Sequence, residues 1–204
     1  MVSDVSPIDG STDSCRKIAF VGTHGVGKTT LCFELAARLK RRGIRVDLVK
    51  EVARRCPLPL NQQTTMAAQA WILHTQIAEE LALCPGHDVL ICDRSAVDNY
   101  AYLVARFGRV EPYDSVVADW IRTYALLVWV PPVDAPSFDG VRDTDLRYQR
   151  EIDRTLHELI EAFALTPLRL DPTRRDSWIE DVVAALPRTA EQLGLFDPDE
   201  PPSR

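Results

Sequence analysis

The chain has 204 residues, of which 46% are hydrophobic and 26% are charged, and its net charge at pH 7 is −6. This length fits one ordinary domain, the composition excludes a disordered chain, and the acidic balance disfavours broad nucleic-acid binding. Because no apolar run reaches the roughly 18 residues that span a bilayer, and no secretory signal is visible, we expect a cytoplasmic protein without a membrane segment.

The sequence has five widely spaced cysteines and no Cys-x-x-Cys pair: Cys15, Cys32, Cys56, Cys84 and Cys92. An odd count at such spacings argues against a disulfide framework or a zinc site. We therefore expect reduced and mostly buried thiols, as is usual in the cytosol.

In chain order, five apolar segments are expected to form β-strands: 17–22, 44–49, 88–92, 125–130 and 168–170. Helical patterns alternate with these strands, at 28–42, 62–83, 96–107, 113–123, 145–165 and 176–194. The polar stretch 1–15 predicts a flexible arm, 16–195 the folded domain, and 196–204 a disordered tail. Residues 133–143 are rich in Pro, Asp, Ser and Gly and predict a mobile loop.

The alternation of strands and helices indicates the fold class. Several strands are apolar throughout, which is typical of a parallel sheet covered by helices on both faces. We therefore predict an α/β fold of three layers with a five-stranded parallel sheet. In such sheets the ligand binds beyond the carboxyl ends of the strands, which here carry 22–29, 50–55, 93–95 and 131–147.

The segment Gly22–Thr29 reads GTHGVGKT and matches the phosphate-binding pattern G-x-x-x-x-G-K-[ST], known as Walker A. Its glycines let backbone N–H groups turn toward phosphate oxygens, and the helix that follows adds partial positive charge. Lys28 supplies a charge for the β- and γ-phosphates, and the Thr29 hydroxyl is a ligand for Mg²⁺. The predicted nucleotide-binding residues are Gly22, Thr23, His24, Gly25, Val26, Gly27, Lys28, Thr29 and Thr30. His24 and Val26 occupy variable positions, and we expect His24 to be a surface or packing residue.

Asp93 follows the apolar run 88–92. This is the Walker B arrangement, in which a carboxylate beside the phosphate loop holds Mg²⁺. The alternative is an aspartate that caps the next helix. Its neighbour Arg94 could reach a phosphate or the transferring group, and its alternative is a surface ion pair.

Three patches of the sequence resemble small P-loop kinases of nucleosides, nucleotides and related metabolites. They also resemble ATPase-like domains related to the ribosylnicotinamide kinase domain. The patches are FVGTHGVGKTT at 20–30, KEVARR at 50–55 and DVLICDRS at 88–95, and the resemblance covers most of 17–185. It implies ATP as co-substrate, Mg²⁺ as cofactor and a small-molecule acceptor.

The resemblance also implies site residues outside the phosphate loop. An acid at the end of the second strand binds or deprotonates the acceptor hydroxyl in such kinases, and Glu51 matches it. The alternative is a structural ion pair with Arg54 or Arg55, which in turn could hold an anionic acceptor. A lid at about 133–147 would bring Arg142 and Arg147 over the phosphates, where the alternative is a charged helix start.

The helix predicted at 62–83 has an apolar face formed by Met66, Ala70, Leu73, Ile77 and Leu81. By the same resemblance this helix covers the acceptor pocket. Trp71 and His74 share another face and could stack on a planar acceptor, or else pack in a core or interface. After the fifth strand, 171–174 could contact the adenine by analogy.

These observations favour a Mg-ATP-dependent phosphotransferase acting on a nucleoside, nucleotide or related metabolite. Two alternatives stay open: a regulatory or switch-type P-loop ATPase without a small acceptor, and a kinase acting on nucleic acid. A GTPase is disfavoured because no Asn/Thr-Lys-x-Asp motif ends a strand. An oligomeric AAA-type motor is also disfavoured, because it would need a second, helical domain for which 204 residues leave no room. We expect no membrane partner, and a homodimer is one option.

Overall fold

The computed structural model describes residues 15–132 and 146–186. Within them lie five strands: β1 (Arg16–Val21), β2 (Val46–Val49), β3 (Val89–Asp93), β4 (Tyr124–Trp129) and β5 (Leu168–Arg169). They form one sheet in the order β2-β3-β1-β4-β5, and every neighbouring pair is parallel. The predicted five-stranded parallel sheet is confirmed, and it places the ends of β1 and β3 side by side.

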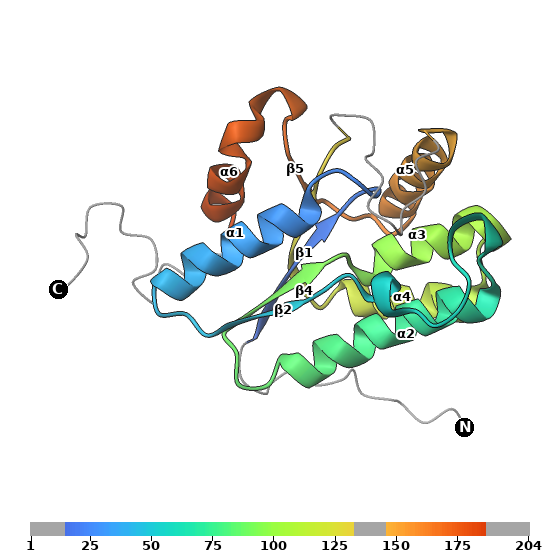
Figure 1. Ribbon diagram of the computed structural model, residues 1–204, viewed down its shortest axis with the longest axis horizontal. Coiled ribbons are helices and arrows are strands. Elements are labelled where there is room, and N and C mark those ends of the chain that lie inside the picture. The colour runs from blue at the N-terminus through green and yellow to red at the C-terminus, as the bar shows by residue number, and fades with distance from the viewer. Residues whose placement is uncertain (1–14, 133–145, 187–204) are drawn as a thin grey trace.

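Helices cover both faces of the sheet (Figure 1). They are α1 (Lys28–Arg41), α2 (Met66–Leu83), α3 (Ala96–Phe107), α4 (Glu111–Ile121), α5 (Leu146–Ala162) and α6 (Trp178–Ala184). The helices α1 and α6 lie on one side of the sheet, and α2, α3 and α4 lie on the other. The predicted three-layer α/β architecture is therefore confirmed.

The core lies on both sides of the sheet. Toward α1 and α6, fully buried side chains include Phe20, Leu35 and Val182. Toward α3 and α5, they include Leu103 and Leu156. Because full burial of one such side chain stabilises a fold by about 1.5–3 kcal/mol, the two apolar layers hold the sheet rigidly between them.

The buried face of α2 differs from the predicted apolar face. Its buried residues are Ala68, Gln69, Ile72, Leu73, Gln76 and Glu80, whereas Leu81 is 60% exposed. The helix begins at Met66 because the Thr65 side chain accepts a hydrogen bond from the Ala68 N–H at 3.1 Å. Hydrophobic periodicity misplaced the face because the buried side carries three polar residues that have hydrogen-bond partners.

The C-terminal helix is shorter than the predicted 176–194 within the described residues. A 3-10 helix at Pro172–Ser177 precedes α6, and residues beyond 186 lie outside the description. The predicted tail, all of the predicted arm except Cys15, and the loop 133–145 with Arg142 also lie outside it.

One pair of cysteines is bonded, contrary to the prediction that all five are reduced. Cys15, which precedes β1, forms a disulfide with Cys84, which follows α2, across 69 residues of sequence. The odd number of cysteines and their wide spacing did not indicate this pair, because it is the fold that brings the start of β1 next to the end of α2. Cys32 and Cys92 are free and buried, as expected, and burial raises the pKa of both thiols.

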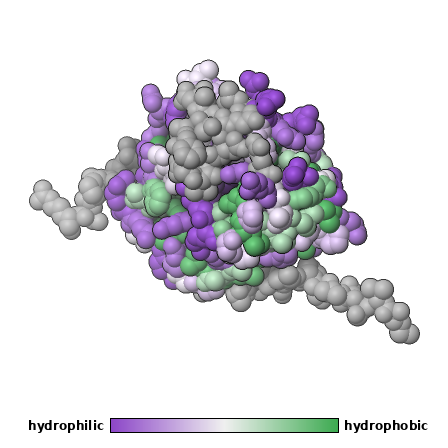
Figure 2. Space-filling model, turned by 45° about the vertical axis from the view of Figure 1, so that its right-hand side comes forward, coloured by the Kyte–Doolittle hydropathy of each residue, from purple (hydrophilic) through white to green (hydrophobic). Residues whose placement is uncertain are grey.

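On the face drawn in Figure 2, hydrophobic side chains form patches separated by hydrophilic ones. Among the helices of the described residues, none combines the length and the apolar character that crossing a bilayer requires.

Candidate functional site

The predicted phosphate loop connects the carboxyl end of β1 to the first turn of α1. Three of its glycines adopt positive φ values: Gly22 at 141°, Gly25 at 79° and Gly27 at 95°. Side chains disfavour these conformations, which let backbone N–H groups point inward. The first turn of α1, Lys28-Thr-Thr-Leu31, contains no acid, so its partial positive charge suits a phosphate.

Gly22 has no room for a side chain. A Cβ atom placed there would lie 2.5 Å from the Val130 carbonyl oxygen, which is backbone and cannot rotate away. We expect Gly22→Ala to lower the free energy of unfolding by about 1–3 kcal/mol more than Gly86→Ala does. Gly86 is the matched control because it also has a positive φ, of 84°, but its Cβ would meet no atom within 4 Å. Urea unfolding measures both variants, and equal losses would contradict the steric argument.

Lys28 is buried at the centre of the loop. Its ammonium donates hydrogen bonds to the carbonyl oxygens of Gly22, at 2.8 Å, and Thr23, at 2.6 Å. Burial, followed by the positive charge of Arg94, lowers the pKa of Lys28 from its ordinary value to about 8. The ammonium is therefore still mostly charged at pH 7 and gains by pairing with an anion.

The Thr29 hydroxyl donates to Asp93 Oδ2 at 2.5 Å, which brings the two predicted metal ligands together. Asp93 is 2% exposed, and its Oδ1 has no hydrogen-bond partner among residues 15–132 and 146–186. A buried carboxylate oxygen without a donor, next to a hydroxyl, fits a hard cation such as Mg²⁺. The capping alternative is wrong, because Ser95 caps α3 by accepting from the Asp98 N–H at 3.2 Å.

Arg94 and Glu51 form a buried ion pair between the ends of β3 and β2. The Arg94 Nε donates to Glu51 Oε1 at 2.9 Å, and each side chain is at most 6% exposed. Arg94 also donates to Asp98 Oδ2 at 3.1 Å and to the Tyr102 hydroxyl at 3.2 Å. The surface ion pair considered for Arg94 is therefore wrong, since its partners are buried acids and a tyrosine.

The alternative considered for Glu51 is also present in the structure. Its Oε2 accepts from the Arg54 Nε at 2.8 Å, while Oε1 is held by Arg94. Arg55 instead pairs with Glu79 on α2. Glu51 thus belongs to a structural pair and to the buried cluster at once, and the two interpretations do not exclude each other.

The sequence interpretation missed a second layer of residues around the phosphate loop. Asp98 is fully buried, and this burial raises the pKa of its carboxyl group although Arg94 opposes the effect. The Gln149 amide donates to the His24 carbonyl oxygen at 3.0 Å and so ties α5 to the loop. The Tyr102 hydroxyl lies 3.2 Å from His24 Nδ1. Asp98 and Tyr102 follow Arg94 at helical spacing, which is the signal that could have indicated them.

His24 is 3% exposed, so it is a packing residue of the loop, as predicted, and not a surface one. Its ring stacks on Tyr148 with 6.2 Å between centroids. Because Arg94 can only donate, the Tyr102 oxygen accepts from it and is free to donate its own proton to His24 Nδ1. In the neutral imidazole the proton then lies on Nε2.

A cavity of about 50 Å³ lies beside the Glu51–Arg94 pair. Its wall combines these two residues with aromatic, amide and aliphatic side chains: His24, Ala53, Leu60, Asn61, Gln69, Ile72, Asn99, Tyr102 and Tyr148. Helix α2 covers it, as expected, but through Gln69 and Ile72. Trp71 and His74 do not line this cavity, because they lie on a different side of α2, and the His74 ring contacts Tyr113.

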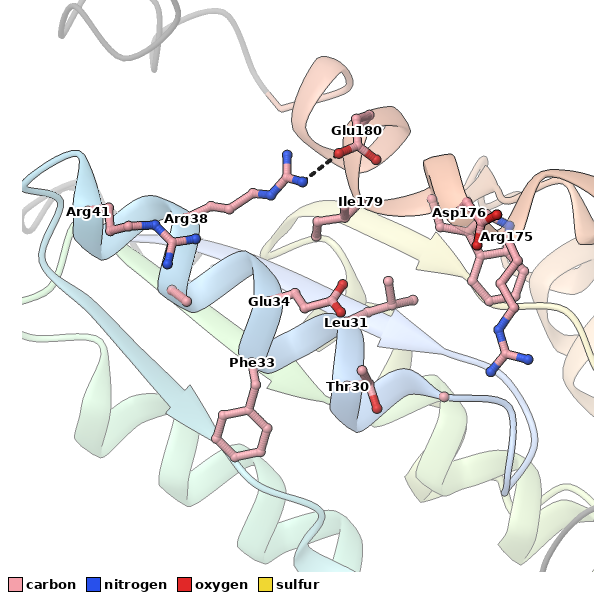
Figure 3. Close-up of a pocket in the computed structure, with 13 residues that line it drawn as sticks. Thr30, Leu31, Phe33, Glu34, Arg38, Arg41, Arg175, Asp176, Ile179 and Glu180 are labelled. Carbon is pink, nitrogen blue, oxygen red and sulfur yellow. Dashed lines mark hydrogen bonds and ion pairs between the residues drawn. The ribbon is translucent and has the colours of Figure 1, made fainter. Parts of the chain in front are cut away.

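A larger cavity of about 770 Å³ runs along α1 on the opposite side of the phosphate loop (Figure 3). Thr30 and Arg175 face each other near its Gly27 end, and Trp178 and Ile179 form part of the wall. The segment 171–174, predicted to contact the adenine, does not line this cavity, and the adenine contact stays a prediction. Arg174 lies 3.6 Å from Asp181, and it is Arg175 that lines the cavity.

Of the two predicted lid arginines, one lies within the described residues. Arg147 lies in the first turn of α5 and is exposed. Arg142 belongs to 133–145, outside the described residues, so its approach to the phosphates stays a prediction.

A family model described as an AAA domain matches residues 17–176, which contain the phosphate loop, Glu51 and Asp93. The chain belongs to this AAA domain family. Among curated proteins, none matches the sequence of this AAA domain protein. The match to an AAA domain does not test whether the protein is an oligomeric motor.

Solved structures resemble the AAA domain in fold. Deoxyadenosine kinase from M. mycoides with bound dATP is 15% identical, with a TM-score of 0.60 over 83% of this chain and 97% of that chain. The same kinase with dCMP and a flexible dCDP is 14% identical, with a TM-score of 0.59 over 88% and 100%. NadR in complex with NR is 18% identical, with a TM-score of 0.63 over 85% and 52%, so this chain spans about half of NadR. At these identities the likeness establishes the fold alone.

Proposed function

We propose that this AAA domain protein transfers the γ-phosphoryl group of ATP to a hydroxyl or phosphate of a small acceptor, such as a nucleoside or nucleotide. The observation that carries the proposal is the buried Glu51–Arg94 pair, which lines a separate cavity next to the phosphate loop. A nucleotide-controlled switch needs the loop and the metal ligands, but it does not need a buried acid in a second cavity.

The donor would be held by charge and by backbone. The loop amides and the N-terminus of α1 bind the phosphate oxygens, and Lys28 exchanges its two carbonyl partners for the β- and γ-phosphates. Because Lys28 is already buried beside the loop, little reorganisation is needed when ATP binds.

Thr29 and Asp93 would hold the magnesium ion, since their side chains already touch and one Asp93 oxygen has no donor. Held by these two side chains, the ion would supply positive charge against the negative charge that develops on the phosphates.

Glu51 would act on the acceptor. The acceptor hydroxyl oxygen attacks the γ-phosphorus, the bond from phosphorus to the β–γ bridging oxygen breaks, and ADP leaves with that oxygen. The acceptor proton passes to the Glu51 carboxylate late in the transfer. Arg94 orients the carboxylate through Oε1, and its positive charge, which also acts on Lys28, would stabilise the transferring group. The exposed Arg147 would add positive charge from outside, and Arg142 is proposed to do the same from the lid.

The wall of the small cavity supports a planar acceptor. Aromatic rings of Tyr102 and Tyr148 can stack on a base, and the amides of Gln69 and Asn99 can pair with its edge. At about 50 Å³ the cavity is smaller than the 300–1,000 Å³ typical of ligand sites, so its walls must move apart when the acceptor enters.

The larger cavity would hold the donor base. It starts at Gly27 and Thr30, immediately behind the phosphate loop, and its volume of about 770 Å³ is sufficient for a nucleoside. We propose that the Arg175 guanidinium packs on the base.

A screen of acceptors tests the proposal. Purified protein with Mg-ATP is mixed in turn with nucleosides, nucleotides, ribosyl cofactors and a DNA oligonucleotide, and ADP release is followed. We expect one small-molecule class to raise the rate well above that of the protein alone. Stimulation by the oligonucleotide only would support the nucleic-acid alternative. A rate that no acceptor changes would contradict the kinase proposal and favour the switch-type ATPase.

A further inference from the structure

A buried carboxylate outside the proposed site receives four hydrogen bonds. Glu80 on α2 is 1% exposed. Its donors are the Lys17 ammonium at 2.8 Å, the Gln76 amide at 2.9 Å, the Trp120 indole at 2.8 Å and the Tyr124 hydroxyl at 2.7 Å. The charge is balanced by Lys17, whose ammonium also lies 3.9 Å from the centre of the Trp120 ring. Glu80 therefore joins α2 to β1, α4 and β4.

Two of these four donors also contact the turn that follows β3. The Gln76 amide donates to the Arg94 carbonyl oxygen at 3.4 Å. The Tyr124 hydroxyl oxygen accepts from the Ala96 N–H at 3.0 Å. The backbone is thus held on both sides of Ser95, within three residues of Asp93.

This turn needs support because its backbone is strained. Arg94 has a φ of 93°, which residues other than glycine rarely adopt. Such a conformation persists only where the surroundings determine it, and it is common where a side chain must be aimed at a ligand. Here it aims the Arg94 guanidinium at Glu51 and leaves Asp93 beside Thr29.

The ionised carboxylate is suited to this task because it can only accept hydrogen bonds. It directs the Tyr124 hydroxyl proton toward itself, so the phenolic oxygen is left to accept from Ala96. In the same way it takes one proton of the Gln76 amide and leaves the other for the Arg94 carbonyl. A buried ion pair can often be replaced by apolar residues at no loss of stability, so stability alone does not require a carboxylate at this position.

We infer that Glu80, acting through Gln76 and Tyr124, is a positioning residue that fixes the turn carrying Asp93 and Arg94. It holds the metal-binding carboxylate and the acceptor-side arginine in register with the phosphate loop. The inference rests on the proposed function, because that function gives Asp93 and Arg94 their roles.

The test uses the full chain and ADP as probe. The dissociation constant of ADP is measured by calorimetry without and with saturating Mg²⁺. The value without Mg²⁺ divided by the value with Mg²⁺, called the magnesium ratio, reports how well Asp93 and Thr29 hold the ion. We expect Tyr124→Phe to lower this ratio about 10-fold, as loss of an outer partner of a metal ligand does. A second variant, Gln76→Met, keeps the other three donors of Glu80 and should lower the ratio in the same direction.

Tyr100→Phe is the matched control. Its hydroxyl is also buried, accepts from a backbone N–H (Val110, 3.0 Å) and donates to a carboxylate (Asp114, 2.6 Å), but within residues 15–132 and 146–186 it makes no hydrogen bond to the turn. We expect a similar fall in thermal midpoint for Tyr100→Phe and Tyr124→Phe, with the magnesium ratio of Tyr100→Phe unchanged.

Three outcomes would overturn the inference: an unchanged ratio in both test variants, an equal fall in Tyr100→Phe, or a wild-type protein whose ADP binding is insensitive to Mg²⁺. A magnesium-dependent affinity that responds as expected, together with no phosphoryl transfer to any acceptor, would contradict the proposed function alone.

Discussion

Replacing Lys28 by methionine is expected to lower the rate of phosphoryl transfer by about 10²–10³-fold, because it removes a preorganised charge from the transferring phosphates. The affinity for ATP should fall as well, by about 10-fold or more, since a hydrogen bond to a charged group contributes about 1.5–3 kcal/mol. Calorimetry gives the affinity, and a coupled assay of ADP release gives the rate.

The thermal midpoint shows whether the loss of activity in Lys28→Met comes from the missing ammonium or from unfolding. Burial disfavours the charged form of Lys28, whose pKa is lowered to about 8, and this offsets the loss of its two hydrogen bonds to backbone carbonyls. We therefore expect an apolar side chain of similar length to change the thermal midpoint only slightly. Lys40→Met is the matched control, because Lys40 lies exposed near the other end of the same helix. Transfer by Lys28→Met at the rate of the Lys40 variant would contradict the role of the ammonium.

Replacing Glu51 by glutamine is expected to lower the transfer rate by about 10²–10⁴-fold while the affinity for ATP stays the same. The amide has nearly the same shape and can still accept a hydrogen bond from Arg94, but it cannot take up the acceptor proton. Steady-state kinetics with a productive acceptor, together with ATP calorimetry, separate these two quantities.

The control for this prediction is Glu79→Gln. Glu79 also pairs with an arginine from the segment after β2, but that arginine, Arg55, does not line the cavity. We expect the Glu79→Gln variant to transfer the phosphoryl group at the wild-type rate. A Glu51→Gln enzyme that transfers at the wild-type rate would remove Glu51 from the mechanism and leave its pair with Arg54 as a structural contact.

Local patterns were sufficient to predict the fold and the phosphate loop. The strands are short apolar runs bounded by turn residues, and the loop depends on backbone conformations that Gly22, Gly25 and Gly27 allow. The pairing of Thr29 with Asp93 could also be expected, because neighbouring parallel strands end at the same edge.

Contacts between distant segments could not be predicted from local patterns. The sequence indicated Arg94 and Glu51 separately, but their ion pair exists because β2 and β3 are neighbours in the sheet. The burial of Gln76 and Glu80 and the Cys15–Cys84 disulfide likewise depend on tertiary packing. Hydrophobic periodicity counts polar residues as exposed, so it misplaces a helix face that buries a satisfied polar network.

The most direct test of the central claim follows where the phosphoryl group goes. Protein, Mg-ATP and the best acceptor from the screen are incubated, and ADP, inorganic phosphate and phosphorylated acceptor are quantified in one reaction by phosphorus NMR. We predict that phosphorylated acceptor forms in the same amount as ADP, with little inorganic phosphate. Inorganic phosphate equal to ADP, with no phosphorylated acceptor, would contradict phosphoryl transfer and identify the protein as an ATPase.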